Sequence, residues 1–209
     1  MSIDALVPLK RLDYAKTRLA SVLDPPTRMR VMRALLDHTL AQVKAAPSIR
    51  TVTLVSSALD APSIADEHGV ALFDDRGAPW NDALAAAIAA AVTADGVVIV
   101  SADVPLLTTG DIESFIAALP ERGAAIARAT DAGTNAVAMR PSGAMPTCFG
   151  ARGSAALHVE LAEAAGLVSV IVDIEGLAHD LDTAADLEEV LRREMSADVR
   201  AVLAGAFAQ

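Results

Sequence analysis

The chain has 209 residues with a formal charge of −10, and 53% of its residues are hydrophobic. This length suits one large domain and is short for two. The acidic charge disfavours generic binding to DNA or anionic lipid, and no apolar run reaches the roughly 18 residues of a membrane helix. The single cysteine, Cys148, rules out an internal disulfide, and the N-terminus has no signal-peptide pattern. We therefore expect a soluble cytoplasmic protein with neither nucleic-acid nor membrane partners.

Strand-like and helix-like segments alternate in the first half of the chain. Residues 5–8 predict a strand, and a basic loop separates it from Asp24-Pro-Pro-Thr27, where an acid and two prolines suit the start of a helix that reaches about Ala45. Apolar residues recur every three or four positions in that helix, which predicts one face packed on a sheet. The later segments of this half are predicted strands at 51–55, 70–73 and 96–100 and predicted helices at 62–68 and 81–92.

The second half continues the alternation. Thr108 or Thr109 can cap a helix that runs to Leu119, and Ser154 can cap a helix that ends at Gly166. The other segments are predicted strands at 124–127, 136–139 and 168–172 and a helix from about Thr183. This pattern predicts a single-domain, Rossmann-like α/β fold, with a mostly parallel open sheet, helices on both faces and ligands at the carboxyl ends of the strands. We place the domain at 1–195 and a helical extension of it, for packing or for a homodimer, at 196–209.

Two acidic segments follow predicted strands. Asp103 comes after the strand 96–100, and Asp180 and Asp182 come after the strand 168–172. In an extended segment Asp180 and Asp182 share one face, because side chains alternate with a period of two. If the two strand ends converge, the three carboxylates are able to hold a metal ion. The alternative is that Asp180 or Asp182 caps the helix near Thr183, which we expect of one of them but which leaves Asp103 unexplained.

A basic loop follows the first predicted strand. Lys10, Lys16 and Arg18 place three cations within nine positions, at the turn that lies beside the phosphate site in anion-binding α/β proteins. The alternative is that these are solvated charges on a helix face. The loop lacks both G-x-x-x-x-G-K-[ST] and G-x-G-x-x-G, so neither a P-loop ATPase nor a dinucleotide-binding enzyme is supported.

An ordered set of short motifs between Leu6 and Leu187 resembles the CofC family, whose members are 2-phospho-L-lactate or phosphoenolpyruvate guanylyltransferases of coenzyme F-420 biosynthesis. The motifs are Pro8-Leu-Lys10, Ala15-Lys16-Thr-Arg18-Leu, Asn81-Asp-Ala-Leu84, Ala102-Asp103-Val-Pro-Leu-Leu107, Gly133-Thr134-Asn135-Ala136, Phe149-Gly150 with Gly153-Ser154 and His158, and Asp180-Leu-Asp182-Thr-Ala-Ala-Asp186-Leu. The resemblance implies a GT-A-like nucleotidyltransferase fold and GTP as donor. It also implies magnesium (Mg2+) held by Asp103, Asp180 and Asp182.

Nucleotidyl transfer is consistent with these residues. Two anionic phosphates must approach each other, and magnesium with a few cations masks their charge, a role we assign to Lys10, Lys16 and Arg18. A phosphate nucleophile is already ionised at neutral pH, so no histidine or serine base is required. The expected product is a guanosine diphospho-acid, with release of pyrophosphate.

Six further residues are predicted to bind the substrates. By resemblance, Asn81 lies near the nucleotide base, although an asparagine at a helix start is also a common cap. The acceptor, a small phosphorylated carboxylate, is assigned to the turn before one strand and to the start of one helix, at Thr134, Asn135, Gly150, Gly153 and Ser154.

The segment before that helix departs from the family pattern. The family commonly has one fewer residue between Gly150 and Ser154 and a basic residue where Leu157 stands. The acceptor therefore stays open between 2-phospho-L-lactate, phosphoenolpyruvate and 3-phospho-D-glycerate. Alternative functions are a molybdopterin-type nucleotidyltransferase, which usually carries a glycine-rich first loop absent here, and a GTP-binding protein without turnover.

Overall fold

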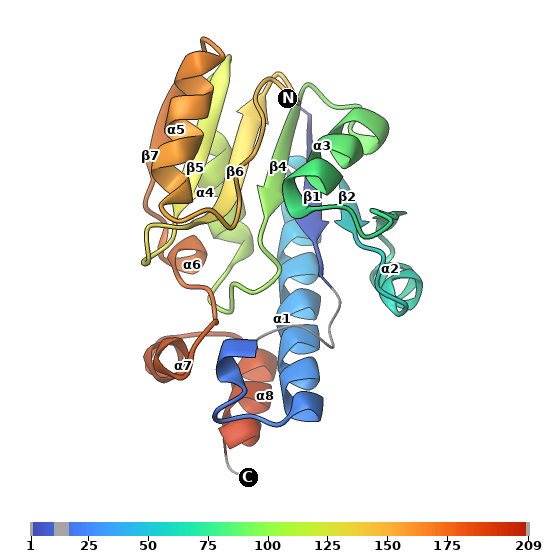
Figure 1. The fold of residues 1–209 in the computed structure, drawn as a ribbon, viewed down its shortest axis with the longest axis vertical. Helices are drawn as coiled ribbons and strands as arrows, with labels where there is room; N and C mark the ends of the chain where they lie inside the picture. Colours follow the sequence, from blue (N-terminus) through green and yellow to red (C-terminus); the bar gives the residue numbers. More distant parts are fainter. Residues whose placement is uncertain (1, 11–16, 208–209) are drawn as a thin grey trace.

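Seven strands form one sheet in the computed structural model, which describes residues 2–10 and 17–207 (Figure 1). Neighbouring strands are parallel except where β6 pairs with β4 and β5, to both of which it is antiparallel. The predicted open, mostly parallel sheet is therefore confirmed. In their order across the sheet the strands are β3 (Ala71–Phe73), β2 (Ile49–Val55), β1 (Ile3–Pro8), β4 (Gly96–Val100), β6 (Thr134–Arg140), β5 (Gly123–Arg128) and β7 (Val168–Val172).

The reversed direction of β6 matters for the site. Its amino end lies at the edge where the parallel strands have their carboxyl ends, because Val100, the last residue of β4, pairs with Ala136. The Ser101 N–H donates to the Asn135 carbonyl oxygen at 2.8 Å. Thr134 and Asn135 thus join the strand ends at which α/β proteins bind their ligands.

Helices cover both faces of the sheet (Figure 1). One face packs against α1 (Pro25–Ala45), α2 (Ala61–His68) and α4 (Thr109–Ala117), and the other against α3 (Trp80–Ala91) and α5 (Ser154–Ala164). Leu36, Leu40 and Val43 of α1 are fully buried against the sheet, at the helical spacing that the sequence predicted. No helix among the described residues is both long and apolar enough to cross a membrane.

The C-terminal segment packs on the free side of α1. The chain passes through α6 (Glu175–Ala178) and α7 (Ala184–Leu191) to α8 (Ala197–Phe207), which lies beside α1 in Figure 1. Leu203 of α8 is buried in one apolar cluster with Leu35 of α1, Leu187 of α7 and Leu19 of the short 3-10 helix η2 (Thr17–Leu19). Helix α8 thus packs on α1 and α7, while the domain boundary at residue 195 and a role of this helix in a homodimer stay predictions.

Helix starts confirm some predicted caps and correct others. The Asp24 carboxylate accepts from the Thr27 N–H at 2.8 Å, and Thr108 forms a capping box with Asp111, as local sequence rules predict. Ser154 does not cap α5, because Gly153 holds the cap position with a left-handed φ of 68°.

The start of α7 is also corrected. Thr183 and Asp186 form its capping box, so neither Asp180 nor Asp182 caps that helix. The Thr183 side chain accepts from the Asp186 N–H, and the Asp186 carboxylate accepts from the Asp182 and Thr183 N–H groups.

Candidate active site

Three carboxylates meet where the parallel strands end. Asp103 follows β4, and Asp180 and Asp182 follow α6, after β7. One ligand oxygen from each of the three residues lies within 4.8 Å of the other two, and all three residues are partly buried. The predicted convergence of the two acidic segments is confirmed. The oxygen donors suit a hard divalent cation such as Mg2+, which takes its other ligands from water and phosphate.

Buried contacts fix the backbone that carries these carboxylates. Leu181 is fully buried between Asp180 and Asp182, so the two aspartates point to the other side of the extended segment. The Leu181 N–H donates to the Asp103 carbonyl oxygen at 3.1 Å, which ties the two acidic segments together. The Asn135 Nδ2 donates to the Leu177 carbonyl oxygen at 3.0 Å and to Asp180 Oδ1 at 3.4 Å. Asn135, predicted to bind substrate, is therefore buried and supports Asp180.

The predicted cations have different surroundings. Lys10, just beyond β1, is exposed, with its Nζ 4.5 Å from the centre of the Trp80 ring. Arg18 lies in η2, and its Nη1 is 3.4 Å from Asp182 Oδ2 in an ion pair exposed to solvent. Lys16 lies outside the described residues. Arg18 therefore joins the acidic triad, and Lys10 stands on the α3 side of the site.

The predicted acceptor residues form a buried hydrogen-bond network. The Ser154 hydroxyl donates to Thr134 Oγ1 at 2.9 Å, which joins the start of α5 to the start of β6. Thr134 Oγ1 is also 3.1 Å from Nδ1 of His158, a fully buried side chain of α5. Ser154 is the first residue of α5 rather than its cap, and its hydroxyl takes this tertiary partner. The network brings Thr134 and Ser154 together, and their role in binding the acceptor stays a prediction.

Two glycines shape the turn before α5. Gly150 has a φ of 80° and Gly153 a φ of 68°, both in the left-handed region that favours glycine. Asn81, in the first turn of α3, reaches this segment and bonds to Thr147 and Phe149. The cap position of α3 is Pro79, so Asn81 is not the cap.

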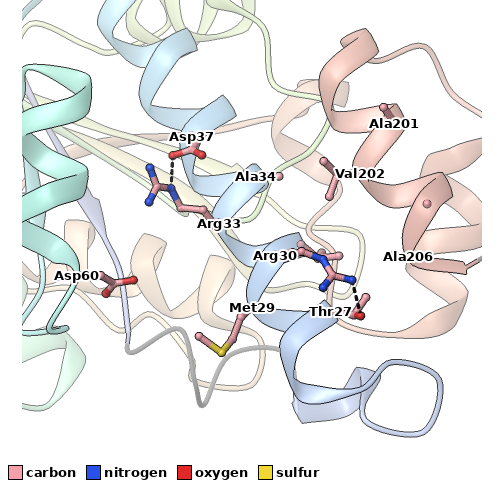
Figure 2. Close-up of a pocket in the computed structure, with 12 residues that line it drawn as sticks. Thr27, Met29, Arg30, Arg33, Ala34, Asp37, Asp60, Ala201, Val202 and Ala206 are labelled. Carbon is pink, nitrogen blue, oxygen red and sulfur yellow. Dashed lines mark hydrogen bonds and ion pairs between the residues drawn. The ribbon is translucent and has the colours of Figure 1, made fainter. Parts of the chain in front are cut away.

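A cavity of about 850 Å³ lies elsewhere, between α1, α8 and the start of α2. Figure 2 shows its charged lining, in which the Arg33 Nε donates to Asp37 at 2.7 Å and Arg30 donates to Thr27 at 2.8 Å. Apolar side chains of both helices, including Met29 and Val202, complete the wall. None of the described residues predicted for the site lines this cavity.

Comparison with known proteins identifies the family. The model of the family described as CofC-like guanylyl transferases matches residues 3–201. The chain belongs to this family. Among its relatives is the phosphoenolpyruvate guanylyltransferase of Sphaerobacter thermophilus, 41% identical, with 91% of this chain and 93% of the relative covered. The 2-phospho-L-lactate guanylyltransferase of Methanothermobacter thermautotrophicus is 31% identical, with 91% and 85% covered.

Solved structures support the nucleotidyltransferase fold of this CofC family member. A protein of Desulfovibrio desulfuricans G20, described as a nucleotide-diphospho-sugar transferase, superposes with a TM-score of 0.80 at 20% identity, covering 99% of this chain and 95% of that one. CMP:2-keto-3-deoxy-manno-octonic acid synthetase in complex with CTP gives a TM-score of 0.61 at 15% identity, with 98% and 99% covered. At these identities the likeness concerns the fold alone.

Sequence reasoning missed one residue of this region. His158 belongs to the family motif, but no role for it followed from the sequence, where it is a lone histidine in a predicted helix. Its partners Cys148, Thr134 and Ser154 become visible only in the folded chain. The one available signal was its spacing of four residues from Ser154, which places both on one helix face.

Proposed function

We propose that this CofC family member transfers GMP from GTP to the phosphate of phosphoenolpyruvate and releases pyrophosphate, as a step of coenzyme F-420 biosynthesis. The observation that carries the proposal is the convergence of Asp103, Asp180 and Asp182 in a chain whose family match covers 3–201. The 41% identity to a phosphoenolpyruvate guanylyltransferase, against 31% to a 2-phospho-L-lactate guanylyltransferase, favours phosphoenolpyruvate as acceptor.

The chemistry requires charge compensation and alignment. A phosphate oxygen of the acceptor attacks the α-phosphorus of GTP, and the bond from that phosphorus to the oxygen leading to the β-phosphate breaks. The electron pair leaves with pyrophosphate. Because the acceptor phosphate is ionised at neutral pH, no side chain has to remove a proton. The buried, neutral His158 is therefore not needed as a general base.

The acidic triad fits magnesium. Asp103, Asp180 and Asp182 would hold the ion, and Asn135 would keep one oxygen of Asp180 in place through its amide. When bound, the ion would neutralise phosphate charge and help to align the reacting groups. We assign Lys10, Lys16 and Arg18 to the remaining triphosphate and leaving-group charge.

The acceptor is assigned to the start of α5. N–H groups in the first turn of this 11-residue helix attract an anion, and Thr134 and Ser154 border them. Gly150 and Gly153 have no side chains, so that a phosphate or carboxylate is able to approach the backbone closely at these two positions.

The test is pyrophosphate release with Mg2+ and GTP, assayed in parallel with phosphoenolpyruvate, 2-phospho-L-lactate and 3-phospho-D-glycerate, and with mass detection of the product. ATP replaces GTP in matched reactions. We expect turnover with GTP and phosphoenolpyruvate and a product mass equal to GMP joined to the acceptor. Turnover confined to another acceptor would overturn the choice of phosphoenolpyruvate. Bound GTP without pyrophosphate under any acceptor would overturn the proposed reaction.

A further inference from the structure

Residues 147–153 form the second part of the connection from β6 to α5 and carry two left-handed glycines, Gly150 and Gly153. It is short of regular hydrogen bonding, so its shape depends on side chains that reach it from other elements. Among residues 2–10 and 17–207, Asn81 from α3 and His158 from α5 form side-chain hydrogen bonds to its backbone. We call residues 147–153 the acceptor loop.

The Asn81 side chain forms three hydrogen bonds to the acceptor loop. Its Oδ1 accepts from the Phe149 N–H at 2.9 Å and from the Thr147 hydroxyl at 2.9 Å. Its Nδ2 donates to the Phe149 carbonyl oxygen at 3.1 Å. The carboxamide thus pairs with both backbone groups of Phe149, as a neighbouring strand would. Because donor and acceptor are both needed, neither alanine nor aspartate can replace it.

His158 holds the adjacent residue. Its Nε2 is 3.0 Å from the Cys148 backbone nitrogen, whose hydrogen it accepts. In the neutral imidazole the proton then lies on Nδ1, which faces the Ser154 carbonyl oxygen at 2.8 Å and Thr134 Oγ1 at 3.1 Å. The side chain is fully buried, and the ring of Phe149 packs edge-on against it with centroids 5.1 Å apart.

Together the two side chains fix Cys148 and Phe149, the residues directly before Gly150. Both anchors lie on helices packed against the sheet, so the loop takes its position from rigid elements. The same His158 contacts Thr134 and Ser154, the hydroxyl pair at the start of α5. A shift of the loop would therefore change the place where the acceptor's acid group is expected.

We propose that Asn81 and His158 are positioning residues that hold the acceptor loop in the conformation that receives the acceptor. This inference rests on the proposed function. It replaces, for Asn81, the contact with the nucleotide base expected from the sequence. Neither residue takes part in the chemical step, so their loss raises the KM for the acceptor and leaves the KM for GTP unchanged.

Cys148 provides a readout that does not depend on catalysis. It is the only cysteine of the chain and lies within the loop, partly buried, with its Sγ 3.7 Å from the Ser154 carbonyl oxygen. Burial raises the pKa of its thiol, which keeps the reactive thiolate scarce. Reaction with a thiol reagent such as 5,5′-dithiobis(2-nitrobenzoic acid) therefore reports release of the loop.

The experiment compares the wild-type chain with Asn81→Asp and His158→Leu. Each variant removes hydrogen bonds to the loop at nearly constant volume, so we expect thiol modification and the KM for phosphoenolpyruvate to rise about tenfold. The KM for GTP should stay within about twofold. His158→Gln, whose amide oxygen is able to accept from the Cys148 N–H, should fall between His158→Leu and the wild type. The matched control is His68→Gln, since His68 bonds to Asp37 away from the loop.

The outcomes separate this inference from the reaction it rests on. Folded variants with unchanged thiol reactivity and unchanged acceptor KM would overturn it, as would an equal rise in both KM values. Absence of turnover in the wild type would overturn the proposed guanylyl transfer. Unchanged rates of thiol modification in the variants would overturn the positioning role of Asn81 and His158, whatever the activity. Circular dichroism checks that each variant folds. If His158→Leu does not fold, the positioning role is tested with two isosteric variants, Asn81→Asp and Thr147→Val. The second of these removes the Thr147 hydroxyl that donates to Asn81.

Discussion

At the residue scale, the acidic triad makes the sharpest prediction. Asp103→Asn keeps the shape of the side chain and removes one charge from the proposed magnesium site. Because charge compensation is worth several kcal/mol in phosphoryl transfer, we expect turnover to fall by at least about a hundredfold. Thermal unfolding should change little, since Asp103 is only partly buried. Near wild-type activity of the variant in saturating Mg2+ would remove Asp103 from the metal site.

Lys10 and Trp80 offer a second residue-scale test. The Lys10 ammonium lies over the ring of the only tryptophan, so the emission of Trp80 reports where this cation is. If Lys10 turns to the triphosphate, GTP should change that emission in the wild type. Lys10→Met, which keeps an unbranched apolar side chain, should lack most of the change and bind GTP about tenfold more weakly. An equal fluorescence response in both proteins would contradict this role.

At the scale of elements, α8 stabilises the segment that carries the acidic pair. Leu203 is almost fully buried in the cluster that also holds Leu181, the residue between Asp180 and Asp182. Leu203→Ala should lower the free energy of unfolding by about 2–4 kcal/mol, measured in urea, because it leaves a cavity. Ala204→Ser, one position along on the exposed face, is the control and should change stability by less than about 0.5 kcal/mol. Equal stability of the two variants would show that α8 is only loosely attached.

At the other end of the strands, near their amino ends, a partly buried ion pair connects β1 to β2 and to the segment after α3. Asp4 of β1 is buried and accepts from Arg50 of β2 and from the Thr93 and Ala94 N–H groups. Burial alone would raise the pKa of this carboxyl, but these donors outweigh it and lower the pKa.

Loss of the Asp4 contacts should lower the free energy of unfolding. Asp4→Asn should destabilise the fold by about 2–4 kcal/mol in urea unfolding, because it removes the negative charge and replaces one of the two acceptor oxygens by an NH2 group that faces buried donors. Asp173→Asn breaks the exposed pair with Arg128 and should cost less than about 1 kcal/mol. A similar cost for both variants would contradict the difference in burial.

At the scale of the whole molecule, the fully buried His158 and the partly buried His38 make stability depend on pH. Burial lowers the pKa of His158 and of His38, whose Nε2 faces the Leu107 carbonyl oxygen at 2.8 Å. Between the lowered folded pKa and the ordinary value of 6.5, the unfolded chain binds more protons than the folded one. Their stabilising effect is thus full above pH 6.5 and is lost as pH falls toward the folded pKa.

The measurement is urea unfolding at pH 7.5, 6.5 and 5.5. We expect the free energy of unfolding to fall by about 1 kcal/mol or more across this range. In His158→Gln this fall should be smaller, because one of the two imidazoles is gone. An identical pH dependence in the variant would show that His158 is not held neutral by the fold.

Local rules in the sequence determined the elements of this protein and much of its site. Apolar periodicity and caps such as Asp24 and Thr108 depend on neighbours a few residues away, so the strands, the longer helices and their order were predictable. The short helices η2 and α6 were not predicted. Alternation along the chain placed Asp180 and Asp182 on one face, and the parallel topology brought Asp103 to them.

Only the tertiary structure decided what the short polar side chains bind. Asn81 and Phe149 are 68 residues apart in sequence, and Ser154 and Thr134 are 20 apart. Ser154 had the right residue type for a cap, but its hydroxyl bonds to Thr134 across the fold instead. A buried hydroxyl or amide takes whichever partner the packing of elements brings within 3 Å or so, and no local pattern encodes that partner. The sequence therefore determined the family and the carboxylates, and the tertiary structure determined which side chains hold the acceptor loop in place.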